Sequence, residues 1–159
     1  MTLSQEQRMY FNECIKDILS CEQVLQLDRY KRHGNTICFR HSVAVAYYSY
    51  LLCSRLGKGF NCRSVIRGAL LHDFLPYDRH EKGTRGLHGL SYSKAVFENA
   101  ENYFWLNIVE RDIIQTHRWP LTARLPKYKE TFVVCMVDKC CCVVETFHLF
   151  SYEGKFKSK

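Results

Sequence analysis

The segment CRSVIRGALLHD, residues 62–73, decides the fold, and it ends in the pair His72-Asp73. Its apolar residues recur at the three- and four-residue spacing of a helix: Val65, Ile66, Ala69, Leu70 and Leu71. Asn61 precedes the segment and Pro76 follows it, which predicts a helix that starts after Asn61 and ends near His72-Asp73. We therefore expect a buried helix with a histidine and an aspartate at its C-terminal end.

Outside this segment, apolar residues at helical spacing predict about five more helices. These lie at about residues 3–20, 36–56, 95–100, 107–117 and 128–150. Thr36 is a candidate N-cap, Ser91 or Ser93 could cap the helix through residues 95–100, and residues 76–90 are expected to form a loop. The last helix is rich in β-branched residues, but its length favours a helix over a strand. The sequence predicts an all-α fold, a compact bundle of about six helices.

The composition is that of an ordinary globular protein. The 159 residues are 47% hydrophobic and 25% charged, which is enough for one domain with a continuous core. No apolar stretch is long enough to span a membrane, and the first residues do not resemble a secretion signal. The nine cysteines include no C-x-x-C pair, which favours reduced, mostly buried thiols. We expect a cytoplasmic protein with no membrane partner.

The net charge of +7 favours an anionic partner. The basic residues are scattered, except for the tail at residues 151–159, which contains Lys155, Lys157 and Lys159. A scattered charge does not favour nucleic-acid binding. A small molecule that carries phosphate suits it better. The sequence does not define an oligomeric state.

Six histidines and aspartates are candidates for one metal site: His41, His72, Asp73, His88, His117 and Asp138. Each has apolar neighbours in sequence, where a polar side chain without a partner would be costly to bury. Asp73 precedes Phe74 and lies two residues after Leu71, so its carboxylate needs a cation or strong donors. One metal ion can satisfy two carboxylates and several imidazoles together.

Three local sequences carry a family resemblance: Arg40-His41-Ser42-Val43-Ala44, Gly68-Ala69-Leu70-Leu71-His72-Asp73 and Val137-Asp138-Lys139. A distant histidine, an adjacent His-Asp and a later aspartate resemble the signature of the HD superfamily of metal-dependent phosphohydrolases. The resemblance covers about residues 36–148 and implies a single HD-like domain over residues 1–159, built as a helical bundle around a metal. It also implies one divalent ion, of Mn, Fe, Co, Ni, Zn or Mg, bound by His41, His72, Asp73 and Asp138.

The resemblance also raises the question of a second metal. His117 is similar to a histidine that often holds a second ion in the superfamily, and His88 could be another. Several relatives have a His-Pro pair where this chain has Tyr92-Ser93. The number of ions, one or two, therefore stays open.

The activity that the resemblance implies is hydrolysis of a phosphoester in a small molecule, with a nucleotide as the expected substrate, by metal-activated water. Asp73, His117 and Lys139 are the candidate catalytic residues, and Arg40, Arg118 and Lys139 the candidate substrate-binding residues. Two alternatives remain. One is a two-metal phosphodiesterase for a cyclic or signalling nucleotide, and the other is a non-catalytic module that binds metal or nucleotide.

A further carboxylate lies close to the last predicted ligand. Glu145 comes seven residues after Asp138, two turns along the same helix face. It could support the site or form a helix salt bridge.

Overall fold

The protein is an all-helical bundle. The structure, a computed structural model, describes residues 2–29, 38–57, 59–75 and 90–147. Its elements are α1 (Gln5–Leu19), α2 (Glu22–Leu25), the 3-10 helix η1 (Gln26–Arg29), α3 (Cys38–Leu56), α4 (Cys62–Leu71), α5 (Leu90–Tyr103), α6 (Ile108–Thr116) and α7 (Lys129–Thr146). No strand occurs within these described ranges. The predicted all-α fold is therefore confirmed, including a helix for the β-branched final segment.

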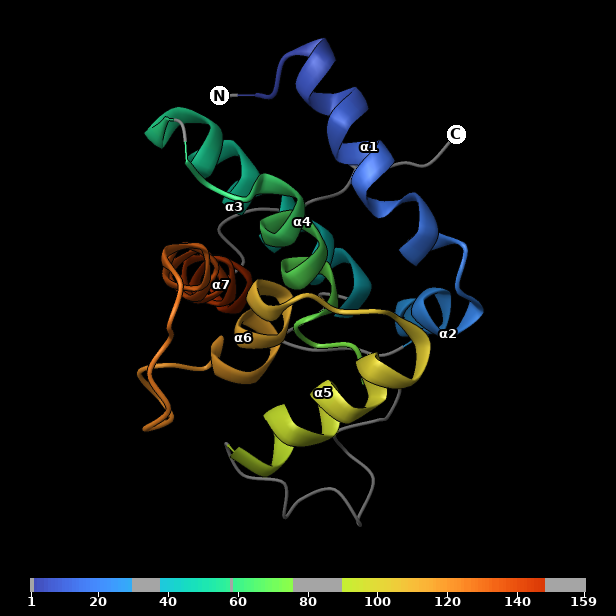
Figure 1. Ribbon diagram of the computed structural model, residues 1–159, viewed down its shortest axis with the longest axis vertical. Coiled ribbons are helices and arrows are strands. Elements are labelled where there is room, and N and C mark those ends of the chain that lie inside the picture. The colour runs from blue at the N-terminus through green and yellow to red at the C-terminus, as the bar shows by residue number, and fades with distance from the viewer. Residues whose placement is uncertain (1, 30–37, 58, 76–89, 148–159) are drawn as a thin grey trace.

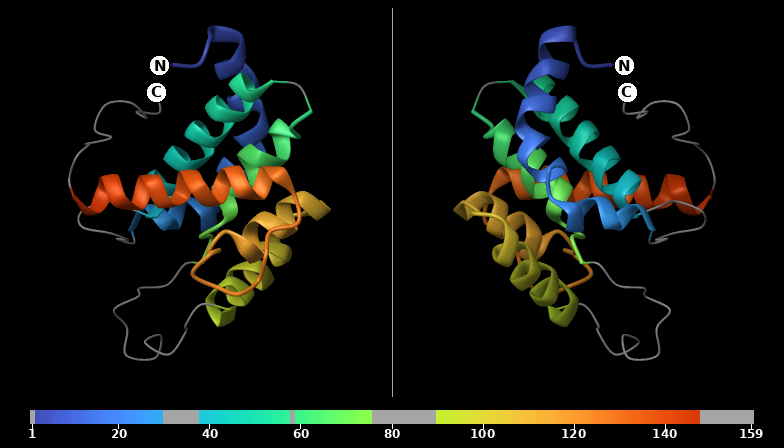
Figure 2. Two further views of the ribbon diagram at one scale, coloured as in Figure 1. Left: turned by 90° about the vertical axis from the view of Figure 1, so that its left-hand side faces the viewer. Right: turned by 90° about the vertical axis from the view of Figure 1, so that its right-hand side faces the viewer.

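Helix α4 is the central element. It contacts α1, α3, α6 and α7, and Figure 1 shows it between them. Its residues Ser64–Leu71 are all buried, as expected for a helix covered on all sides. Helices α3 and α7 also pack on each other, whereas α5 contacts α6 at the far end of the molecule (Figures 1 and 2). The C-terminal end of α4 therefore lies where several helices converge.

A glycine allows α4 and α6 to pack closely. A Cβ atom added at Gly68 would lie 2.7 Å from Cδ1 of Ile113 and 3.1 Å from its Cβ atom. A methyl group at position 68 would therefore force Ile113 to shift. The small residue in the GALLHD segment thus allows the close approach of α6, which brings the end of α6 to the end of α4.

Several helix ends follow from local side-chain hydrogen bonds. Asn61 caps α4 by accepting from the backbone N–H of Ser64, which confirms the predicted start of this helix. A capping box of Asn107 and Glu110 begins α6. Gly57, with φ +103°, follows the last residue of α3 and adopts the left-handed conformation typical of a helix C-terminus.

Some local predictions need correction. Ser91 and Ser93 lie inside α5 and do not cap it, because this helix already begins at Leu90. The sequence pattern also missed α2 and η1, whose few residues are too short for a periodic signal. Thr36 and residues 76–89 of the expected loop lie outside the described residues.

Candidate metal centre

Five of the predicted metal-site residues come together at the centre of the bundle. His41 lies in the first turn of α3, His72 is the C-cap of α4, and Asp73 follows it. His117 is the C-cap of α6, and Asp138 lies in the middle of α7. All five residues are at most 4% exposed. Residues from four helices thus form one buried polar cluster.

Two histidines are oriented by the ends of their own helices. Nδ1 of His72 donates to the backbone carbonyl of Ala69 at 2.6 Å, and Nδ1 of His117 donates to that of Ile114 at 2.9 Å. In each case the acceptor is a carbonyl of the last turn, which no helical N–H satisfies. A neutral imidazole that donates from Nδ1 carries a lone pair on Nε2. The Nε2 atoms of His72 and His117 therefore carry the lone pair that a metal ligand needs.

The third histidine is oriented by a carboxylate. Nδ1 of His41 lies 2.9 Å from both carboxylate oxygens of Glu145, and neither side chain is exposed. Its Nε2 atom lies 3.1 Å from Oδ1 of Asp138. A carboxylate behind a histidine fixes the ring and makes the opposite nitrogen a better metal ligand. The contact joins α7 to α3. Glu145 therefore supports the site and is not part of a salt bridge within its own helix.

The Nε2 atoms face carboxylate oxygens at ligand spacing. Nε2 of His72 lies 3.5 Å from Oδ1 of Asp138 and 3.8 Å from Oδ2 of Asp73. Donor atoms of His41, His72 and Asp73 all lie within 4.8 Å of one another. Ligand atoms about 2.1 Å from one ion lie roughly 3.0 to 4.2 Å apart. In the four-ligand set of His41, His72, Asp73 and Asp138, the first three residues therefore have the spacing that one metal ion needs, and Asp138 contacts both histidines.

The lone pairs give a physical reason for a cation. An imidazole lone pair and a carboxylate oxygen repel each other unless a proton or a metal ion lies between them. Here Nε2 of His117 also faces Oδ1 of Asp73, at 3.8 Å. Three imidazoles thus point at two aspartates in a buried space, the arrangement that a divalent ion satisfies as a whole.

Two further side chains contact the aspartates. The hydroxyl of Tyr92 donates to Oδ1 of Asp73 at 3.0 Å. The thiol of Cys142 donates to Oδ1 of Asp138 at 3.6 Å, and its sulfur lies within 4.8 Å of donor atoms of His41 and Asp138. These contacts fix the carboxylates and place a soft donor beside the four-ligand set.

The electrostatic environment favours a cation. The cluster contains the carboxylates of Asp73, Asp138 and Glu145, and Nζ of Lys139 lies 3.5 Å from Oδ2 of Asp138. Lys139 also donates to the backbone carbonyl of His117 at 2.7 Å. The three carboxylates, when ionised, outnumber the two cations that border the cluster, Lys139 and Arg118. The C-terminal ends of α4 and α6 add partial negative charge, so a divalent cation suits the site.

Of the predicted substrate-binding residues, Arg118 and Lys139 lie beside the cluster and Arg40 does not. The guanidinium of Arg118 lies 4.8 Å from the ring centroid of Tyr92, and Lys139 lies beside Asp138. Both cations thus border the cluster. Arg40 is exposed on the first turn of α3, pointing away from the fully buried His41 that follows it. The predicted ligand His88 lies outside the described residues.

Sequence reasoning missed the roles of Tyr92 and Cys142. In the sequence Tyr92 is only a departure from the family pattern, yet its hydroxyl reaches Asp73 across 19 positions of sequence. Cys142 had a signal that could have been used, because it lies four residues after Asp138 on the same helix face. Because three cysteines follow one another at residues 140–142, the sequence does not single out Cys142.

Comparisons with protein families, with curated proteins and with solved structures gave no match for this chain. The assignment of the site therefore depends on its geometry.

In the described part of the chain, no helix combines the length and the apolar character needed to cross a bilayer. All nine cysteines have free thiols, as the sequence predicts.

Proposed function

We propose that the protein is a metal-dependent phosphohydrolase of the HD superfamily that cleaves a phosphoester of a small molecule, with a nucleotide as the preferred substrate. The observation that carries the proposal is the convergence of three imidazole Nε2 atoms on two buried aspartates. The chain order of the four-ligand set, with its adjacent His72-Asp73, supports the choice of this superfamily.

The chemistry follows from the donor set and the cations beside it. A divalent ion in the four-ligand set would make hydroxide available from water near neutral pH and withdraw charge from a phosphoryl oxygen. Nitrogen and oxygen donors suit Mn, Fe, Co, Ni or Zn, and the aspartates also suit Mg. Lys139 and Arg118 supply positive charge beside the cluster, where phosphate oxygens would bind. Tyr92 holds Oδ1 of Asp73 and so fixes the orientation of that carboxylate.

The test is hydrolysis by the metal-loaded protein. Nucleoside monophosphates, cyclic nucleotides and generic phosphoesters are assayed with Mn, Co, Mg and Ni. We expect turnover of at least one class, abolished in Asp73→Asn and unchanged in Glu98→Gln, whose carboxylate is exposed and pairs with Lys94. Protein that binds metal but hydrolyses none of these compounds would contradict the proposal and favour the non-catalytic binding module.

One observation favours the two-metal phosphodiesterase as a second candidate. The two oxygens of Asp73 face different histidines, since Oδ2 lies 3.8 Å from Nε2 of His72 and Oδ1 lies 3.8 Å from Nε2 of His117. A carboxylate shared in this way can bridge two ions. Metal analysis distinguishes the candidates. If His117→Ala lowers the metal content from two ions to one and removes activity on diesters, the phosphodiesterase is favoured.

A further inference from the structure

The outer face of α7 is apolar from Phe132 to the C-cap residue Phe147, after the exposed Lys129 at its N-terminal end. The residues on it form the outer stripe: Phe132, Met136, Cys140, Val143 and Phe147. All of them are exposed, with exposed fractions of 43% for Phe132, 54% for Met136, 53% for Val143 and 68% for Phe147. At 3.6 residues per turn the stripe covers an arc of about 80°. Asp138 and Glu145 lie on the opposite side of α7, so the stripe is separate from the metal centre.

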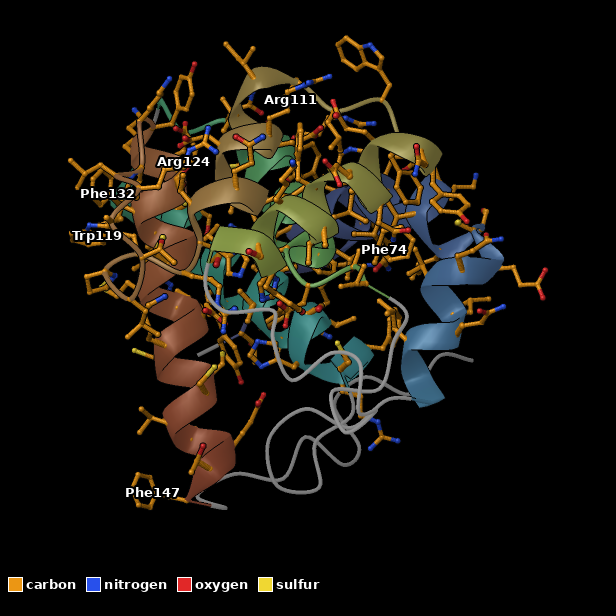
Figure 3. The ribbon with its side chains drawn as sticks, turned by 90° about the horizontal axis from the view of Figure 1, so that it is seen from below. Phe74, Arg111, Trp119, Arg124, Phe132 and Phe147 are labelled. Atoms are coloured by element: carbon orange, nitrogen blue, oxygen red, sulfur yellow. The ribbon has the colours of Figure 1, made fainter. Side chains whose placement is uncertain are left out.

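The stripe is not an ordinary solvent-facing helix surface. None of its five members is charged, whereas the outer face of a solvated helix is normally charged or polar. The left view of Figure 2 shows α7 crossing the molecule with this side open, and Figure 3 shows Phe132 and Phe147 near opposite ends of the helix. Apolar patches of this kind mark interaction sites.

Neighbouring residues enlarge the patch. Trp119 packs against Phe132 with ring centroids 5.6 Å apart, and Leu121 and Leu125, in the segment that leads into α7, are 79% and 63% exposed. At about 200 Å² for a fully exposed large side chain, the exposed parts of Phe132, Met136, Val143, Phe147 and the two leucines amount to roughly 700 Å². A stable dimer buries about 800 Å² on each partner. The patch is therefore large enough to form the core of a dimer interface.

The order of residues along the stripe fits a second copy of itself. Phe132 and Phe147 are equally far from the midpoint between residues 139 and 140, and so are Met136 and Val143. In a two-fold interface, residue i contacts residue j of the other copy, and j contacts i. An antiparallel pair of α7 helices therefore places aromatic rings together at both ends and the smaller side chains at the centre.

The charges at the ends of α7 favour an antiparallel pair over a parallel pair. Lys127 and Lys129 are exposed at the N-terminal end of α7, and the ammonium of Lys129 lies 4.6 Å from the ring centroid of Phe60 in its own subunit. A parallel pair would bring the Lys127 side chains of both copies together, whereas an antiparallel pair places Lys127 near the helix C-terminus of the other copy. That end carries partial negative charge. At the centre, the ammonium of Lys139 contacts Asp138 and the carbonyl of His117, and so is held toward its own subunit.

We propose that the protein forms a two-fold dimer in which α7 pairs antiparallel with α7 of a second copy through the outer stripe, with the axis near residue 140. The pairing does not depend on the proposed hydrolase activity. It covers the exposed apolar face and braces the helix that carries Asp138 and Glu145 from behind.

The test is sedimentation of the full chain over a range of concentrations. We expect a species of about twice the chain mass of 18.8 kDa. Met136→Glu puts a charge into the apolar seam and should weaken the dimer at least about 100-fold. Phe147→Glu should do the same from the end of the seam. The control Ile108→Glu changes an equally exposed apolar residue on α6 and should leave the dimer intact.

A double variant tests the register. In the antiparallel pair, position 136 of one copy lies opposite position 143 of the other, so Met136→Glu with Val143→Lys creates two ion pairs across the seam. We expect this double variant to regain the dimer that Met136→Glu loses. Far-ultraviolet circular dichroism confirms that each variant is folded. A monomer at all concentrations, a dimer unaffected by Met136→Glu and Phe147→Glu, or a double variant that stays monomeric would each overturn the proposal.

Discussion

Replacing the carboxylate behind His41 should weaken metal binding without removing any ligand. Glu145→Gln keeps the shape of the side chain, and its amide oxygen can still accept from Nδ1 of His41, but the negative charge is lost. Such supporting partners typically contribute 10- to 100-fold to metal affinity. Because one acceptor remains, we expect a loss of about tenfold, at the lower end of that range.

The loss can be read from thermal unfolding with and without metal. At a free metal concentration of 100 times Kd, binding stabilises the wild type by about 2.7 kcal/mol, and a tenfold weaker Kd leaves about 1.4 kcal/mol. For a domain of this size each kcal/mol corresponds to about 2–4 °C in Tm. The metal-induced rise in Tm should fall from about 5–11 °C to about 3–6 °C.

A second buried carboxylate provides the control. Glu110 is 2% exposed and pairs with Arg67 at 3.1 Å, away from the metal ligands. Glu110→Gln should lower the Tm of the metal-free protein and leave the metal-induced rise unchanged. If Glu145→Gln shows the same metal-induced rise as the wild type, the reasoning that Glu145 supports a metal-binding histidine is refuted.

Three further predictions concern packing, thiols and acid stability. Gly68→Ala should lower the free energy of unfolding by about 1–3 kcal/mol in urea denaturation, because the added methyl group would overlap α6; an unchanged value would contradict the close packing. Burial raises the pKa of Cys53 to about 12, whereas Cys140 is exposed, so an alkylating reagent at pH 8 should label Cys140 first, as followed by mass spectrometry. Equal labelling rates of Cys53 and Cys140 in the folded protein would contradict this prediction. Burial alone would raise the pKa of Asp17, but its hydrogen bond to Arg67 and the charge of that guanidinium offset this and hold the pKa below its usual range. The Asp17 carboxylate therefore stabilises the fold above about pH 4 and loses this effect as the pH falls through its lowered pKa, so the stability advantage of the wild type over Asp17→Asn should shrink on acidification below pH ~4. A stability difference between the wild type and Asp17→Asn that stays constant down to pH ~2 would contradict this prediction.

The helices and their order could be predicted because they depend on local patterns. The apolar spacing in residues 62–73 and the position of Asn61 are enough to define α4, and the same spacing defines α1, α3, α6 and α7. Helices α2 and η1 were missed because each is about one turn long. Their formation depends on neighbouring elements, such as the contact of η1 with α3.

The candidate metal ligands could be proposed from residue order, but their supporting contacts could not. His41 and Asp138 could be proposed because their types and order match a known signature. The hydrogen bond from Tyr92 to Asp73 depends on where α5 lies relative to α4, and sequence spacing does not give that placement. The same holds for Arg67, which is buried in α4 because Asp17 of α1 and Glu110 of α6 both approach it. Such pairs are set by the tertiary structure.

The metal content of the purified protein tests the central claim most directly. Wild-type protein and Asp73→Ala are loaded with excess Mn, Co, Ni or Zn, dialysed against metal-free buffer, and measured by elemental analysis. The account predicts one or two equivalents per wild-type chain and none in Asp73→Ala, with circular dichroism showing that the variant is folded. A wild-type protein without metal, or a folded variant with the same metal content as the wild type, would contradict the account.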